Sequence, residues 1–105
     1  MRRVVLSSED WSTPADFAVG FTDRLLGNLR SGAGTSVVLR AKTVHSFGQR
    51  QPIEIVGLDR NMRVVAARTL PPNRIVVLPA AKLIVELPAG SPLPGVAARV
   101  VITDV

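Results

Sequence analysis

The chain lacks cysteine and tyrosine, and its only histidine is His45. Without cysteine it can form no disulfide, no thiolate zinc site and no cysteine nucleophile. A single histidine is too few for the multi-histidine clusters of common metal and catalytic sites. The composition therefore predicts neither a metal site nor a cofactor.

Long apolar runs are also missing. The N-terminal run Val4-Val5-Leu6 is far shorter than the roughly 7–15 apolar residues of a secretory signal. No stretch approaches the roughly 20 apolar residues of a membrane helix. These absences predict a cytoplasmic protein with no membrane insertion.

The composition is that of one folded domain spanning residues 1–105. Of the 105 residues, 47% are hydrophobic, with eight glycines and eight prolines. That apolar share is too high for a disordered chain, and the length suits one domain with a modest core.

Positive charge is concentrated in the middle of the chain. The net charge is +5, and residues 24–82 hold ten basic residues against Glu54 and Asp59, a local charge of +8. A basic segment attracts polyanions, so weak electrostatic binding of nucleic acid or acidic lipid stays open. Phe47 is the only aromatic residue between positions 24 and 82, so stacking on bases is not expected. We therefore predict no specific nucleic-acid partner.

A helix is expected over residues 14–25. Thr13 has the chemistry of an N-cap, Pro14 suits the first helical position, and Asp16 follows in the first turn. One apolar stripe at helical spacing is formed by Phe17, Phe21 and Leu25.

The rest of the chain favours strands. Short apolar or β-branched segments separated by turn residues lie at 3–7, 36–42, 53–58, 63–68, 74–78, 82–87 and 98–103. Asn61 is the residue expected to adopt a positive φ in the hairpin between the third and fourth segments. The sequence predicts a mainly β protein, a compact β-sandwich or barrel with one principal helix near residues 14–25. The residues expected in its core include Phe17, Phe21, Ile55, Val65, Val85 and Leu87.

Three segments resemble a known family. They are Val44–Asp59, with the letters VHSFGQRQPIEIVGLD, Ala81–Gly90, with AKLIVELPAG, and Ala18–Arg24, with AVGFTDR. In this order and spacing they resemble the conserved, uncharacterised family catalogued as domain of unknown function 192. Its corresponding patterns are V-H-[ST]-F-x-M-R-x-P-I-D-V-V-F-L-D, V-L-E-L-P-A-G and A-x-G-L-M-x-R. The resemblance implies a β-rich sandwich or barrel with a short helix and implies no activity.

Several positions depart from the family pattern. Gln49 replaces a methionine, Gln51 an aromatic residue, Glu54 an aspartate and Met62 the hairpin glycine. The two glutamines place polar groups where the resemblance leads us to expect apolar ones.

His45, Arg50 and Glu54 are the candidate site residues. If the chain folds back at Gly48, His45 approaches Glu54 on a paired strand, and a histidine–carboxylate pair can act in acid–base catalysis. The alternative is a structural histidine at the edge of a sheet. No nucleophile accompanies the pair, because Ser46 points to the opposite face of the strand from His45.

Other polar patterns favour structural roles. Glu86 lies in an apolar run, so it either faces outward or is buried with a partner, for which Arg50, Arg68 and Arg74 are candidates. A buried, structural ion pair is favoured over a ligand-binding role. The loop at 31–35 resembles a phosphate cradle but lacks the lysine and the following helix of a P-loop.

The favoured interpretation is a non-enzymatic binding or accessory module. Its expected partner is another protein or a small anionic ligand near Arg50. The first alternative is a small hydrolase or lyase using His45 and Glu54. The second is a weak electrostatic binder of nucleic acid or acidic lipid.

Overall fold

The protein is mainly β, as the sequence predicts. The computed structural model describes residues 2–18 and 36–105, and this part of the chain contains nine strands and no helix. The strands are β1 (Arg2–Ser8), β2 (Trp11–Phe17), β3 (Val37–Leu39), β4 (Thr43–His45), β5 (Ile53–Leu58), β6 (Val64–Leu70), β7 (Ile75–Val77), β8 (Leu83–Leu87) and β9 (Val101–Asp104).

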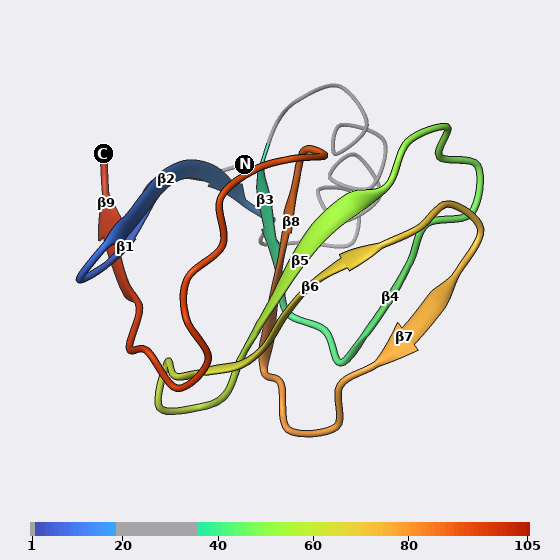
Figure 1. Ribbon diagram of the computed structural model, residues 1–105. Coiled ribbons are helices and arrows are strands. Elements are labelled where there is room, and N and C mark those ends of the chain that lie inside the picture. The colour runs from blue at the N-terminus through green and yellow to red at the C-terminus, as the bar shows by residue number, and fades with distance from the viewer. Residues whose placement is uncertain (1, 19–35) are drawn as a thin grey trace.

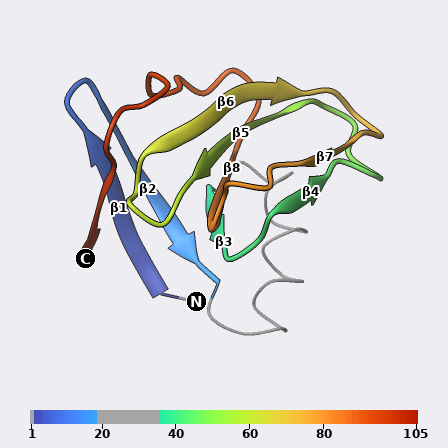
Figure 2. The same ribbon diagram turned by 90° about the horizontal axis from the view of Figure 1, so that it is seen from below.

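Seven strands form one sheet in the order β6-β5-β8-β3-β2-β1-β9, and β4 pairs with β7 in a second sheet (Figure 1). Every pairing is antiparallel except that of β2 with β3. The large sheet curves, as Figure 2 shows from below. No helix in the described residues is long and apolar enough to cross a membrane.

The two faces of the large sheet carry separate apolar clusters. The larger cluster consists of Val4, Leu6, Trp11, Ala15, Phe17, Val38, Val56, Leu58, Val64, Val85, Leu87 and Val100. The second cluster joins the small sheet to β5, β6 and β8 and consists of Val44, Ile53, Ile55, Leu70, Leu78, Ala81 and Ile84. Strands β4 and β7 therefore cover part of one face, and they do so through inward side chains such as Val44.

The two edges of the large sheet meet at one point without closing a barrel. Val64 N–H donates to Ala98 O at 2.9 Å, and Val100 N–H donates to Met62 O at 2.8 Å. An isolated antiparallel bridge pairs Arg63 with Arg99. The segment before β9 thus touches the start of β6, although β9 itself pairs only with β1. Of the two predicted architectures, a β-sandwich or a barrel, the described strands do not close the barrel.

The helix predicted over residues 14–25 is wrong for its first turn, because residues 14–17 belong to β2. Asp16 N–H donates to Ser36 O at 2.9 Å, on the side of β2 that faces β3. Pro14 lies two residues earlier and so faces the same side. Since β3 pairs with β2 only at Asp16 and Phe17, no ladder bond is lost where proline lacks its N–H.

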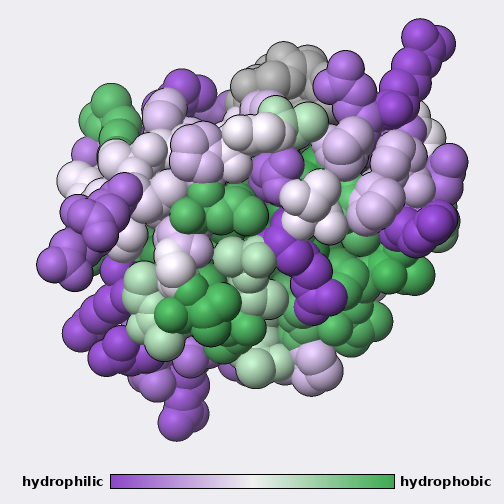
Figure 3. Space-filling model, in the orientation of Figure 1, coloured by the Kyte–Doolittle hydropathy of each residue, from purple (hydrophilic) through white to green (hydrophobic). Residues whose placement is uncertain are grey.

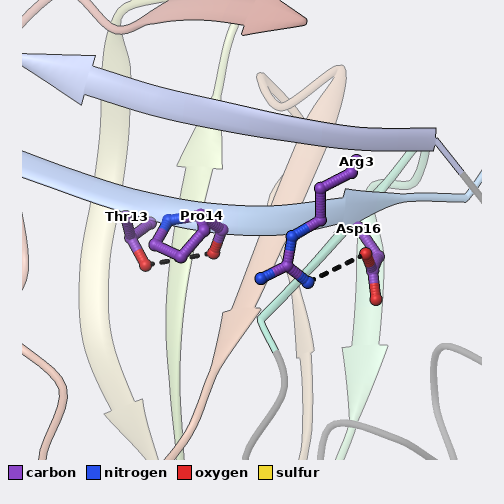
Figure 4. A network of polar contacts seen from close by, with 4 residues as sticks. All are labelled: Arg3, Thr13, Pro14 and Asp16. Atoms are coloured by element: carbon purple, nitrogen blue, oxygen red, sulfur yellow. Dashed lines mark hydrogen bonds and ion pairs between the residues drawn. The ribbon is translucent and has the colours of Figure 1, made fainter. Parts of the chain in front are cut away.

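The polar residues read as helix caps have strand roles instead. The Thr13 hydroxyl donates to the Pro14 carbonyl at 3.2 Å. Asp16 accepts a hydrogen bond at 3.2 Å from Arg3, its direct partner on β1 (Figure 4). The remainder of the predicted helix, with Phe21 and Leu25, lies outside the described residues, as does the loop at 31–35.

Most other structural predictions hold. The strand predicted at 53–58 matches β5, and Phe17, Ile55, Val85 and Leu87 are buried. Val65 is only half-buried, at the margin of the second cluster. The hairpin residue with positive φ is Met62 (φ 63°) and not Asn61.

Candidate functional site

The chain turns at Gly48, where Gln49 N–H donates to Ser46 O at 3.2 Å, but the turn does not pair the strand of His45 with that of Glu54. His45 lies on β4, where its partner is Ile75 of β7. Glu54 lies on β5 of the large sheet, between Thr69 and Leu87. In the described part of the chain, no hydrogen bond or ion pair joins the imidazole to the carboxylate. The paired strands required for the predicted acid–base unit are therefore absent.

The Glu54 carboxylate is buried, and both of its oxygens are engaged. Its residue is 6% exposed. Oε1 accepts a hydrogen bond from the Thr69 hydroxyl at 2.5 Å, and Oε2 accepts one from Gly90 N–H at 2.8 Å. Gly90 has φ 81°, so its turn suits glycine. Glu54 thus joins β5 and β6 to the turn that follows β8.

His45 is exposed at the surface and stacks on Phe47. The ring centroids are 5.2 Å apart, with 23° between the planes. Phe47 N–H donates to His45 Nδ1 at 3.4 Å. The local contacts orient the ring along the surface of the small sheet.

Arg50 and Glu86 occupy contrasting environments. Arg50 is exposed, while Glu86 is 1% exposed on β8, between Val37 and Ile55. Neither Arg50 nor the two other arginines considered as partners, Arg68 and Arg74, forms an ion pair with Glu86. All three arginines are exposed. The predicted burial of Glu86 is confirmed, and its predicted pairing with these residues is wrong.

The surface that sequence reasoning missed is the outward face of the small sheet, which we call the β4–β7 face. Large apolar side chains are exposed there: Phe47 at 56%, Ile75 at 59% and Val77 at 58%. Because strand residues alternate, Val44 and Val76 point inward to the core, and their neighbours Thr43, His45, Ile75 and Val77 point outward. An apolar area lies over the position of β7 in Figure 3.

One sequence signal for this face was available. The run Ile75-Val76-Val77 has no polar residue to mark an outward side, whereas a strand with one solvated face normally alternates. The alternation expected of a half-buried strand is broken here, because the two exposed residues, Ile75 and Val77, are apolar. Their exposure follows from the pairing of β7 with β4 on the surface.

The segments that build the β4–β7 face carry basic and no acidic residues. Residues 36–52 and 71–82, which contain both strands and their turns, include no aspartate or glutamate. They contain five basic residues: Arg40, Lys42, Arg50, Arg74 and Lys82. All five are exposed. The Arg40 guanidinium lies over the Phe17 ring of β2, in the large sheet. Lys42 Nζ donates to Pro79 O at 2.8 Å, which fixes one ammonium beside the end of β7.

Ser46 holds one end of the small sheet together. It is fully buried, and its hydroxyl donates to Pro71 O at 2.5 Å and accepts from Arg74 N–H at 3.0 Å. Its own N–H donates to Arg74 O at 2.8 Å. These bonds connect the turn before β7 to the turn that carries Phe47. They therefore fix the position of Phe47 relative to β7.

A metal centre finds no support in the described residues, where no three His, Asp or Glu side chains are grouped to hold an ion. Compared with models of known families, with curated proteins and with solved structures, the chain matches none.

Proposed function

We propose that the protein is a non-enzymatic binding module that docks another protein on the β4–β7 face. The observation that carries this proposal is the exposure of Ile75 and Val77 on the small sheet, together with that of Phe47 in the turn after β4. Single exposed apolar residues are ordinary, whereas a group of them indicates an interaction surface.

The basic surroundings define the chemistry of the partner. Lys42, Arg50 and Arg74 are exposed next to or within the turns of the small sheet, and the segments that build it hold no carboxylate. A partner surface with apolar side chains among acidic groups is complementary to such a face. In this proposal Arg50 contacts acidic groups of the partner as one of several cations, and it does not form an anion site by itself.

An apolar and basic surface also suits an acidic lipid. We favour a protein because, among the described residues, the outer edges of the small sheet have no strand partner, and a peptide can pair with such an edge through its main chain whereas a lipid cannot. Binding to vesicles of phosphatidylserine and phosphatidylcholine is therefore a control for the proposal. If vesicles bind the protein and no peptide does, the proposed docking of a protein is wrong.

The test is a display selection with the full chain as bait and a library of random linear dodecapeptides. Enriched peptides should combine acidic with apolar residues, and should lose most of their affinity for an Ile75→Ser/Val77→Ser variant. The matched control is Val96→Ser/Val101→Ser, which changes two exposed valines elsewhere (67% and 55% exposed). The proposal is wrong if enriched peptides bind both variants equally well.

Two expectations from the sequence remain proposals. A hydrolase or lyase mechanism would need Glu54 to release Thr69 and Gly90, because both carboxylate oxygens are already hydrogen-bonded. Kinship with the family of domain of unknown function 192 rests on the sequence patterns alone. One hydrogen bond, from Gly90 N–H to the Glu54 carboxylate, joins two of the segments that carry the resemblance, P-I-E and E-L-P-A-G.

A further inference from the structure

The hydrogen-bond register of the small sheet determines which main-chain N–H and C=O groups point to its free edges. Leu78 N–H donates to Lys42 O at 2.7 Å, and Ser46 N–H donates to Arg74 O at 2.8 Å. In an antiparallel pair, residues directed at the partner strand alternate with residues directed away from it. Val44 of β4 and Val76 of β7 therefore direct their main-chain groups at each other. The N–H and C=O groups of Ile75 and Val77 point to the free edge of β7.

The same two residues present their side chains on the β4–β7 face. Ile75 and Val77 thus combine an exposed apolar side chain with main-chain groups directed at an edge. In the described residues β7 hydrogen-bonds only with β4. The strand carries no proline, charge or bulge, which are the usual features that keep an edge strand from pairing.

We infer that the partner binds as an extended acidic segment that adds a strand to the free edge of β7. This inference rests on the proposed function and states its recognition mode. Main-chain bonds to Ile75 and Val77 supply affinity, and alternate side chains of the segment contact the β4–β7 face. Acidic residues in the segment lie near Arg74 and Arg50.

The edge of β7 suits this role better than the edge of β4. The outward residues of β4 are Thr43 and His45, and the His45 ring is already stacked on Phe47. The β7 edge offers two aliphatic side chains with more than half of their surface exposed, 59% and 58%. An added strand buries both of them along with the unpaired amides.

The test measures binding of a fluorescent nonapeptide of alternating glutamate and valine, by anisotropy, to the full chain. Val77→Pro removes one outward N–H and leaves the bonds between β4 and β7, since Val77 does not donate to β4. Its matched control is Thr43→Pro, which makes the same change at the residue directly opposite. Proline at edge positions of this kind is tolerated. Val77→Pro should weaken binding about tenfold, and Thr43→Pro should leave it within about twofold.

A second measurement does not depend on the variants. In the wild-type protein, hydrogen exchange at the Ile75 and Val77 amides should slow markedly when the peptide binds, while exchange at Thr43 should stay unchanged. Strand addition at β7 is wrong if these two amides gain no protection, if Thr43→Pro is the harmful change, or if the peptide does not bind at millimolar concentration. If Ile75→Ser/Val77→Ser loses binding while Val77→Pro binds fully, the proposal of a docking face on β4 and β7 stands and the proposal of strand pairing is wrong.

Discussion

Replacement of Glu54 by alanine tests whether this carboxylate is a structural group. The side chain is 6% exposed and accepts hydrogen bonds from Thr69 and Gly90. A hydrogen bond to a charged group contributes about 1.5–3 kcal/mol. Both donors belong to residues that are themselves exposed, so water can replace the carboxylate and the lower end applies. Glu54→Ala should therefore reduce the free energy of unfolding by about 2–3 kcal/mol.

Further variants divide this loss between the two partners. Glu54→Gln keeps the volume and one acceptor, so it should cost about 1 kcal/mol. Thr69→Val removes one donor and should cost about 1 kcal/mol. Because the residues are in contact, the loss in the double variant Glu54→Ala/Thr69→Val should fall short of the sum of the single losses.

The assay is urea denaturation followed by the fluorescence of Trp11. This tryptophan is the only one in the chain and is 8% exposed in the larger apolar cluster. The midpoint should fall while the slope stays constant, and the melting temperature should drop by about 8–12 °C. The control is Glu9→Ala, in the exposed turn between β1 and β2, where a change within about 0.5 kcal/mol is expected. If Glu54→Ala costs no more than this control, the structural role assigned to Glu54 is wrong.

Four further predictions concern the packing and charge of the fold. Ser46→Ala should lower the free energy of unfolding by about 1–3 kcal/mol, while Ser12→Ala, at an exposed position of β2, should change it by less than about 0.5 kcal/mol; equal losses in urea denaturation would contradict the role of Ser46. Leu58→Ala should cost about 2–5 kcal/mol in the same assay, because Leu58 is fully buried, and a loss below about 1 kcal/mol would place it outside the core. Ala97→Gly should raise thermal stability by a few degrees, because Ala97 has φ 73°, and a lower melting temperature would argue against that conformation. Retention on heparin should vanish steeply with rising salt if the basic segments bind polyanions only electrostatically; retention at high salt would indicate a specific polyanion site.

Local sequence patterns predicted which segments form strands better than they predicted which strands pair with each other. Ile53–Leu58 and Leu83–Leu87 are rich in β-branched and aliphatic residues, so their strand state follows from the sequence alone. Phe17 fits both the helical spacing with Phe21 and the period-two spacing with Ala15 and Trp11, and the structure adopts the second. The ambiguity arises because helix and strand periods coincide at some spacings. Pairing with β1 resolves it.

The candidate site was harder to predict than the fold because it depends on pairings distant in sequence. His45 and Glu54 are close along the chain, yet their strand partners are Ile75 and Thr69. The residue types at 44–54 do not specify those partners. The exposure of Ile75 likewise follows from the position of β7 on the surface, so composition alone would have placed it in the core.

The strand order has a consequence for folding during synthesis. Strand β8 (Leu83–Leu87) lies between β3 and β5, although it leaves the ribosome after both. Until it emerges, the apolar edges of β3 (Val37–Leu39) and β5 (Ile53–Leu58) have no partner in the large sheet beyond those given by β2 and β6. Hairpins β1–β2 and β5–β6 can form early, because each joins strands adjacent in sequence. The nascent chain thus carries two exposed sheet halves that invite aggregation, and residues 83–87 convert them into one sheet.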